Sequence, residues 1–226
     1  FERSDESQTF FKSMKEYIEE GKKGWEKAKK LSVSLPKEMS AVPQAHYAPD
    51  PQSFQLLVDL VITDNEADTF QNALNRLGFD NVKVSRQTHF EIAYQGIRGK
   101  GSLEKYAAKM IESGVLLNTA KETPTMVQGK ERLTYSKNSH RFIQPDDQKS
   151  STVSLLVRDK QDFVGLSKTQ SLKSRLKMKE VAAVKTGTVW HLEIDTKSDS
   201  VREKLMKQLV KTRLFGNPHI QDIFIY

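Results

Sequence analysis

The chain has 226 residues, of which 37% are hydrophobic and 29% are charged, so it is long enough for one large domain or two small ones with buried cores. It has no cysteine, which excludes disulfides, thiolate metal sites and cysteine nucleophiles, and no apolar run approaches the roughly 18–20 residues of a membrane span. Its 36 basic and 29 acidic residues give a net charge of +7, which favours anionic partners only weakly.

The first segment, residues 1–49, predicts a helical arm followed by an extended linker. Its apolar residues recur at alternating spacings of three and four, which places them on one stripe of a helix, and lysines fill the opposite face. Pro36, Pro43 and Pro49 then favour an extended chain. The stripe predicts docking into a groove of a partner protein through the partner-binding residues Phe10, Phe11, Met14, Tyr17, Ile18 and Trp25. Packing of the arm on the protein's own repeats and contact with a membrane surface stay open as alternatives.

Residues 50–127 carry the periodicities of a small α+β unit. A leucine- and valine-rich strand is expected from Phe54 to Thr63, followed by a helix over "EADTFQNALNRLGF". The alternating stretch "VKVSRQTHFEIAY" predicts two strands joined by a turn, and a second helix follows the glycine-rich loop "GIRGKGS". A closing strand after that helix is left open. The predicted order is therefore strand, helix, two strands, helix.

The same order of elements is expected again in residues 151–226, after a polar connector at residues 128–150. A strand "TVSLLV", a helix, a hairpin that turns near Thr186–Gly187 and a second helix are followed by an alternating strand at the end of the sequence. At an offset of 100 residues Phe90 matches Trp190, and neighbouring aliphatic positions match as well, which predicts a tandem duplication. The expected fold class is α+β, with two ferredoxin-like repeats of β-α-β-β-α(-β) form preceded by the N-terminal helical arm.

The stretches "NALNRLGFDNVKVSRQTHFEIAY" and "LLNTAKE" resemble the small subunit of formylglycinamidine ribonucleotide synthase, the PurS family. The last segment matches the family's helix-ending pattern more fully, through Leu214, Asn217, Pro218, Ile220 and Asp222. The resemblance covers both repeats. It implies a non-catalytic subunit that dimerises through its sheets and bridges a glutaminase to a synthetase, and two copies in one chain would resemble a linked dimer.

The family's Asp-Pro-Gln-Gly turn after the first strand is missing from both copies. The corresponding residues are Asp64–Ala67 in the first repeat and Asp159–Asp162 in the second. Because a fold can persist after its function has changed, the missing turn weighs against the purine-pathway role that the resemblance implies. A structural subunit of this synthase therefore stays an alternative.

The sequence offers no motif for catalysis or for a bound cofactor. Five histidines are spread along the chain without zinc-ligand spacing, and no serine elbow, HExxH or phosphate-binding Walker sequence occurs. In the two predicted hairpins, alternation places four polar residues on the face opposite the core, where we expect solvated or interface side chains: His89, Glu91, His191 and Glu193. We therefore expect no catalytic residue, no metal site and no cofactor.

One loop has the composition of an anion site. In "GIRGKGS", Arg98 and Lys100 precede a predicted helix whose N-terminus favours negative charge, so these two residues are the predicted anion contacts. The alternative is a flexible connection with solubilising charges, and the second repeat has "DTKSDS" at this place.

Taken together, the patterns predict a cytoplasmic, non-enzymatic scaffold or adaptor subunit of a larger protein complex, which binds partner proteins through its repeats and its N-terminal arm. Three alternatives stay open: the purine-synthase subunit, an adaptor of a bacterial secretion complex, and a basic nucleic-acid-binding protein. Nucleic-acid binding would need exposed aromatic residues on the central strands, whereas Phe90, Tyr94 and Trp190 share the parity of the aliphatic residues and are expected in the core.

Overall fold

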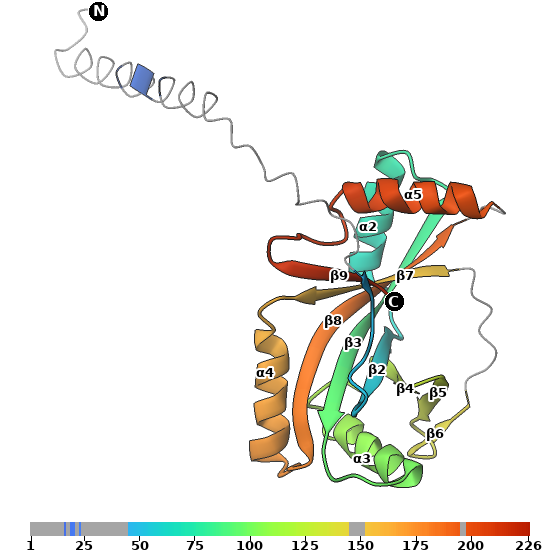
Figure 1. Ribbon diagram of the computed structural model, residues 1–226, viewed down its shortest axis with the longest axis vertical. Helices are drawn as coiled ribbons and strands as arrows, with labels where there is room; N and C mark the ends of the chain where they lie inside the picture. Colours follow the sequence, from blue (N-terminus) through green and yellow to red (C-terminus); the bar gives the residue numbers. More distant parts are fainter. Residues whose placement is uncertain (1–15, 17–18, 21–22, 24–44, 145–151, 195–197) are drawn as a thin grey trace, which may run out of the picture. The chain divides into compact units, whose positions relative to one another are not determined.

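The computed structural model describes residues 16, 19–20, 23, 45–144, 152–194 and 198–226 (Figure 1). The chain divides into two compact units, Phe1–Met39 and Ser40–Tyr226, and the sheet belongs to the second. The few described residues of the first unit are helical. The partner-binding residues predicted on the arm lie outside the described residues and stay a prediction: Phe10, Phe11, Met14, Tyr17, Ile18 and Trp25.

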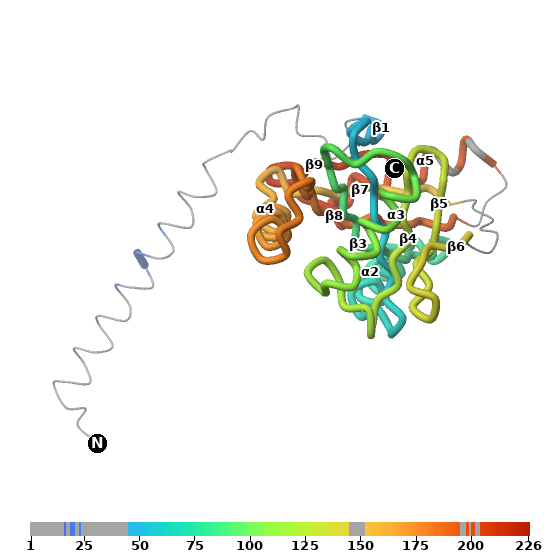
Figure 2. The backbone as a smooth tube through the Cα atoms, turned by 90° about the horizontal axis from the view of Figure 1, so that it is seen from below, coloured from blue at the N-terminus to red at the C-terminus, as the bar shows by residue number. Residues whose placement is uncertain are grey.

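Among the described residues, nine strands form one sheet in the order β1-β9-β7-β8-β3-β2-β4-β5-β6, and the chain course can be followed in Figures 1 and 2. The strands are β1 (Ala45–His46), β2 (Ser53–Leu60), β3 (Val82–Tyr94), β4 (Glu122–Gln128), β5 (Glu131–Ser136), β6 (Arg141–Ile143), β7 (Thr152–Asp159), β8 (Val181–Ile194) and β9 (Gln221–Ile225). The helices are α2 (Asn65–Arg76), α3 (Lys100–Glu112), α4 (Phe163–Gln170), the π-helical turn η1 (Ser171–Arg175) and α5 (Asp199–Lys211). No described helix is long and apolar enough to cross a membrane. The α+β fold class is confirmed.

The chain builds the same pattern twice. The run β2-α2-β3-α3-β4 forms the strand order β3-β2-β4, and the run β7-α4-β8-α5-β9 forms the strand order β8-β7-β9. The closing strand that the sequence left open in the first copy is β4, which pairs with β2 as β9 pairs with β7. One turn bond is also repeated, since the Val61 amide donates to the Lys121 carbonyl and the Lys160 amide donates to the Ile220 carbonyl. The two runs therefore share one topology.

The two predicted hairpins are wrong, because β3 and β8 are each one continuous strand. β3 has 13 residues and β8 has 14, and they pair with each other over their whole length, from Val82 opposite Ile194 to Tyr94 opposite Val181. Gly187 favoured a turn, but it lies within β8, where a Cβ atom would come 2.7 Å from a carbonyl oxygen of β7. The glycine thus reflects the close approach of β7 rather than a reversal of the chain.

The pairing of the two long strands defines a pseudo-twofold axis. Thr88 of β3 lies opposite Thr188 of β8. These two threonines are also equivalent in the duplication, because they differ by the same 100 residues as Phe90 and Trp190. Residues that are equivalent in the two repeats and also paired with each other must lie on the axis. The pseudo-twofold axis therefore passes between Thr88 and Thr188.

The helices pack on one face of the sheet in two groups, and each group combines both repeats (Figure 1). Leu74 of α2 and Leu209 of α5 are fully buried in one hydrophobic cluster, together with Trp190. Met110 of α3 shares the other cluster with Leu172 of η1, the turn that follows α4. The first helix of each repeat therefore packs with the second helix of the other repeat. The two cores are interleaved, and neither repeat buries its apolar surface alone.

Two short strands extend the sheet beyond the first repeat. β5 pairs with β4, and β6 pairs with β5, within the stretch 128–150 that the sequence marks as a polar connector. Leu133 and Tyr135 alternate with polar residues on β5, and both are buried. So short a run carries only two apolar positions, which is too little for a periodicity to stand out. Residues 145–151 of that stretch lie outside the described residues.

The other face of the sheet has a small apolar cluster to which no described helix contributes: Leu57, Val127, Leu156 and Val189, with Tyr47, Phe224 and Tyr226 packed against it. A strap, residues 47–52, crosses this face. At one end the Tyr47 amide donates to the Ile225 carbonyl on β9 at 2.7 Å, and at the other end the Tyr94 amide on β3 donates to the Gln52 carbonyl at 3.0 Å. The strap therefore joins the second repeat to the first.

His89 and Glu91 are buried beside the strap, which corrects the expectation of solvated side chains. The exposed fraction is 0% for His89 and 2% for Glu91. Glu91 accepts hydrogen bonds from the Tyr47 hydroxyl at 2.9 Å and from the Asp50 amide at 3.0 Å, and it pairs with Arg158 at 2.8 Å. The covering residues lie 41 and 44 positions before Glu91 in the sequence, so alternation within one strand cannot predict them.

Candidate functional site

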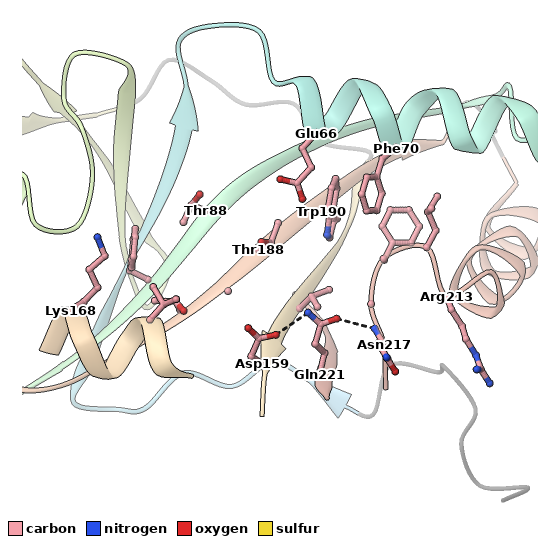
Figure 3. Close-up of a pocket in the computed structure, with 18 of the residues that line it drawn as sticks. Glu66, Phe70, Thr88, Asp159, Lys168, Thr188, Trp190, Arg213, Asn217 and Gln221 are labelled. Atoms are coloured by element: carbon pink, nitrogen blue, oxygen red, sulfur yellow. Dashed lines mark hydrogen bonds between the residues drawn. The ribbon is translucent and has the colours of Figure 1, made fainter. Parts of the chain in front are cut away.

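A groove of about 490 Å³ lies on the helix-bearing face where the two repeats meet (Figure 3). Thr88 and Thr188 both line it, which places it on the pseudo-twofold axis. Phe70 from α2 and Lys168 from α4 line it from either side. Its volume falls in the range of roughly 300–1,000 Å³ that is typical of ligand sites in proteins.

The groove is hollow because small side chains stand at the axis. Thr88, Thr186 and Thr188 form the floor, between the larger side chains of Phe90 and Trp190. The exposed fraction of Phe90 is 4% and that of Trp190 is 3%, which confirms that both belong to the core as expected from their parity. Both nevertheless line the groove, so the core reaches the surface at this point.

An aspartate ties the start of each flanking helix to the long strand below it. Asp64 caps α2 and pairs with Arg86 of β3 at 2.8 Å. Asp162 caps α4 and accepts a hydrogen bond from the Thr186 hydroxyl of β8 at 2.7 Å. Farther along the helices, Gln71 of α2 accepts a hydrogen bond from the Val84 amide, and Thr169 of α4 accepts one from the Val184 amide. Both of these strand positions lie farther from the axis than Arg86 and Thr186. Both helices therefore begin beside the axis and run away from it, which leaves the floor open between them.

A fixed aromatic wall closes one side of the groove. The ring of Phe70 stacks on Trp190 with centroids 4.1 Å apart, and the ring of Phe215 meets Trp190 edge-on at 5.7 Å. Such aromatic pairs contribute about 0.5–1.5 kcal/mol each beyond the area they bury. Three elements supply these rings, namely α2, β8 and the loop after α5, so the wall is held by both repeats.

The charged side chains that line the groove balance, two acidic and two basic, and Glu66 shares its arginine, Arg86, with Asp64. Glu66 pairs with Arg86 at 2.7 Å, and Asp159 accepts a hydrogen bond from the Gln221 amide at 2.9 Å (Figure 3). The Lys168 ammonium donates to the Val115 carbonyl, which leaves its charge uncompensated. The Arg213 guanidinium has no hydrogen-bond or ion-pair partner among the described residues.

Helix α4 exposes three large apolar side chains, of which Val164 lines the groove. The exposed fraction is 71% for Phe163, 55% for Val164 and 56% for Leu166, and Val164 also lines the groove. Single exposed apolar residues are common, so it is the position of Val164 at the groove that relates this helix to an interaction surface.

A second polar arrangement lies on the opposite face, where one side chain from each of four adjacent strands forms a row. The Ser154 hydroxyl donates to Nδ1 of His191 at 2.8 Å, Nε2 of His191 donates to Gln87 at 2.8 Å, and the Gln87 amide donates to Asp59 at 2.7 Å. Burial lowers the pKa of His191 to about 4, and the nearby Arg132 guanidinium lowers it further in the same sense. The ring is therefore neutral at pH 7, and it is half-buried rather than solvated as expected.

The charges beside the strap are held in one protonation state by their neighbours. Burial alone would raise the pKa of Glu91, but the Asp50 amide, Arg158 and the Tyr47 hydroxyl outweigh it and lower that pKa to about 2. Burial, together with the Arg158 guanidinium, lowers the pKa of His89 to about 3. Glu91 is therefore charged and His89 neutral at pH 7, so the pair tie the strap down without any histidine charge.

The predicted anion contacts do not line the groove. Lys100 is the first residue of α3 and pairs with Glu131 of β5 at 2.6 Å, while Arg98 is exposed in the loop before it. Lys100 is thus already paired with an acidic residue of the protein itself. Anion binding by Arg98 and Lys100 stays a prediction that no other observation supports.

The residues that line the groove were not among the predicted sites, although the duplication carried a signal for them. An axis of a tandem duplication lies where equivalent positions of the two copies meet, and Thr88 and Thr188 are such positions. The sequence did not predict that β3 pairs with β8, because each of these strands was expected to form a hairpin.

No group of three or more His, Cys, Asp or Glu side chains within the described part of the chain is placed to hold a metal ion. No model of a known protein family matches the chain, and no curated protein sequence matches it. The function is therefore inferred from the chemistry of the groove.

Proposed function

We propose that the protein is a non-catalytic adaptor, and that it binds a short segment of a partner protein in the groove between its repeats. The observation that carries this proposal is the aromatic wall of Phe70 and Trp190, which faces an open groove at the axis instead of being closed over by a helix. Buried aromatic anchors in a pocket of this kind are the usual centres of protein interfaces.

The composition of the groove supports binding rather than catalysis. Threonine hydroxyls and aromatic rings form its floor and wall, and the carboxylates of Glu66 and Asp159 are engaged by Arg86 and Gln221. A general base or nucleophile needs a neighbour that activates it, and the lining residues provide no such pair. An apolar side chain of a partner, by contrast, would gain about 25 cal/mol for each Å² that it removes from water here.

The exposed rim of α4 enlarges the surface that a partner would cover. Val164 lines the groove and is exposed, so its burial under a partner segment would add to the energy gained by the anchor. The N-terminal arm, with its predicted anchors, is a second surface for partner proteins in this proposal, and a complex held at two places gains from the high effective concentration of the second contact.

Site-specific photo-crosslinking in the source cell tests the proposal. A photo-reactive amino acid replaces Val164 at the rim in one full-length variant and Lys185, an exposed residue on the opposite face, in the other. We expect protein adducts from position 164 that are weak or missing at position 185. Adding Thr188→Phe, which fills the floor, should suppress the adducts of position 164 and leave those of position 185 unchanged.

The proposal fails if both positions give the same adducts, or if filling the floor leaves the adducts of position 164 unchanged. A thermal melt of the Thr188→Phe variant serves as the folding control, because an overpacked core costs about 1–3 kcal/mol and should lower the midpoint only slightly. A smaller filling variant, Thr88→Leu, repeats the test from the other strand.

A further inference from the structure

The indole N–H of Trp190 is a hydrogen-bond donor that the protein itself leaves unused. The side chain of Trp190 lines the groove and the exposed fraction of the residue is 3%, yet it has no hydrogen-bond partner among the described residues. Within this part of the chain, the one sealed side-chain nitrogen or oxygen without a partner is Nε of Arg158, beside the strap. Nε1 of Trp190 therefore reaches open space, and the groove is the space that Trp190 lines.

The ring is held so that this donor has a fixed direction. Phe70 stacks on it with centroids 4.1 Å apart, and Phe215 meets it edge-on at 5.7 Å. In Figure 3 the indole nitrogen lies at the end of the ring that points away from α2. Buried tryptophan N–H groups usually have a hydrogen-bond partner, so a fixed donor that faces an open groove indicates a partner supplied by a ligand.

The first repeat has no such donor. Its residue at the equivalent position is Phe90, which is also buried and also lines the groove. A phenylalanine ring fills this core position without any polar atom, so packing alone does not require tryptophan here. The second repeat thus adds an N–H to the wall of the groove at a place where its sister copy has none.

The rest of the lining suits an uncharged peptide segment. The hydroxyls of Thr88 and Thr188 have no hydrogen-bond partner among the described residues, and a hydroxyl can both donate to a carbonyl and accept from an amide. The charged residues of the lining balance, two acidic and two basic. Burial of a net charge in the groove would therefore cost desolvation without an excess of opposite charge to compensate for it.

We infer that Trp190 donates a hydrogen bond from Nε1 to a main-chain carbonyl of the bound segment, and that this segment is uncharged where it crosses the groove. The inference rests on the proposed function. An apolar side chain of the segment packs against the aromatic wall, and a carbonyl beside it accepts from the indole. The wall then selects the side chain, whereas the placed donor fixes the backbone. A nucleobase also carries carbonyl oxygens, so the experiment includes one as an opposing outcome.

NMR follows the donor directly, because the chain has two tryptophans and Trp25→Phe leaves one indole signal, that of Trp190. The full-length ¹⁵N-labelled Trp25→Phe protein is titrated with four acetylated, amidated peptides, GSLSG, GSGSG, GELEG and GKLKG, and with uridine. We expect GSLSG to move the indole proton signal downfield and to shift the amide signals of Thr88 and Thr188. GSGSG, which lacks the apolar anchor, should shift none of them. GELEG and GKLKG should bind about twofold to fivefold more weakly than GSLSG.

Removing the donor measures how much it contributes. 3-Benzothienylalanine at position 190 replaces the N–H by sulfur and keeps the shape of the ring, so the thermal melt should not change. Loss of one hydrogen bond should weaken the binding of GSLSG about twofold to tenfold, as measured from the Thr88 and Thr188 amide signals. Trp190→Phe, which introduces the residue of the first repeat, should weaken it at least as much. Lys185→Met, at an exposed position on the opposite face, should leave it unchanged.

The possible results separate the inference from the proposed function. If GSLSG shifts the threonine amides without moving the indole proton, or binds the benzothienyl protein with full affinity, the hydrogen bond is wrong and the binding groove stands. Tighter binding of GELEG or GKLKG than of GSLSG overturns the uncharged segment, and tighter binding of uridine than of every peptide overturns it in favour of a nucleobase. If no probe shifts a signal of the groove while position 164 still crosslinks a partner through an open floor, the inference is wrong and the proposed function stands. If that crosslinking fails as well, both are wrong.

Discussion

His89 on β3 and His191 on β8 lie on neighbouring strands and on the same face of the sheet, yet one is fully buried beside the strap and the other is half-buried in an open polar row. Both rings donate from Nε2 to a glutamine, His89 to Gln55 at 3.0 Å and His191 to Gln87 at 2.8 Å. The difference lies at Nδ1. It accepts from the Arg158 guanidinium in His89 and from a serine hydroxyl in His191.

Two parts of one sheet face therefore have different tasks, and each part, or half, is defined here by the histidine that it contains. The half that contains His89 is covered by the strap and by Tyr226, and its charges are all engaged, so it ties the two repeats together. The half that contains His191 keeps a row of hydrogen bonds, from Ser154 to the Asp59 carboxylate, that water can reach. One half is therefore structural, and its energy should depend on a single ion pair, whereas the other half should tolerate substitution.

The largest expected effect is the loss of the ion pair in the covered half. Replacing Glu91 with leucine should destabilise the fold by about 3–5 kcal/mol, because the Arg158 guanidinium is left buried without its carboxylate. The Nε atom of Arg158 already lacks a hydrogen-bond partner among the described residues, so no spare acceptor compensates for the loss. Urea denaturation at pH 7 measures the free energy of unfolding.

Two controls accompany this substitution. Glu193→Leu, at an exposed position of β8 on the same face, should change the free energy of unfolding by no more than about 0.5 kcal/mol. The double variant of Glu91→Leu with Arg158→Leu should recover much of the lost stability, because it removes the unpaired charge. A loss below about 1 kcal/mol for Glu91→Leu would show that the strap does not depend on the ion pair.

A smaller effect should appear as pH dependence, and it separates the two histidines. The folded-state pKa is about 3 for His89 and about 4 for His191, both below the 6.5 of an unperturbed histidine. The unfolded chain therefore binds more protons, and stability that is complete above pH 6.5 is lost as the pH falls toward these values. Between pH 6 and 4 each histidine should contribute a slope of up to about 1.4 kcal/mol per pH unit.

Urea denaturation of His89→Gln and His191→Gln at half-unit steps from pH 7 to 3.5 tests this slope. Each substitution should flatten the profile between pH 6 and 4 by a similar amount. Below pH 4 the two should diverge, since His191 becomes protonated in the folded protein while His89 stays neutral to about pH 3. A wild-type stability that stays constant from pH 6 to 4 would show that both rings take up protons in the folded protein as readily as in the unfolded chain, contrary to their burial.

The sequence predicted what depends on local pattern and missed what depends on distant segments. The fold class, both helices of each repeat and the final strand follow from periodicity, and the core positions of Phe90 and Trp190 follow from parity. Alternation also placed His89 and Glu91 on the correct face. It could not show that the strap, 41 residues earlier at its nearest contact, would bury them.

The candidate site was missed for a related reason. The sequence pattern predicts a turn near Gly187, and a hairpin there would keep β3 and β8 from pairing along their full length. Without that pairing, Thr88 and Thr188 have no reason to meet, and the groove cannot be located. A glycine inside a strand pattern can mark either a turn or the close approach of another backbone, and only the partner strand decides between them.

The smallest expected effect concerns the row of hydrogen bonds that contains His191. Substitutions there should change the position of the histidine proton more than the stability of the fold. Ser154→Ala removes one hydrogen bond and should cost about 0.5–1.5 kcal/mol, while Gln87→Leu removes the acceptor of the Nε2 proton of His191. In the wild type, ¹⁵N chemical shifts should show both His89 and His191 protonated on Nε2. Gln87→Leu should shift His191 toward a mixture of the two tautomers and leave His89 unchanged, because its own glutamine and arginine are intact. A change at His89 would mean that the two halves of this face are coupled, contrary to the division of tasks inferred from their contacts.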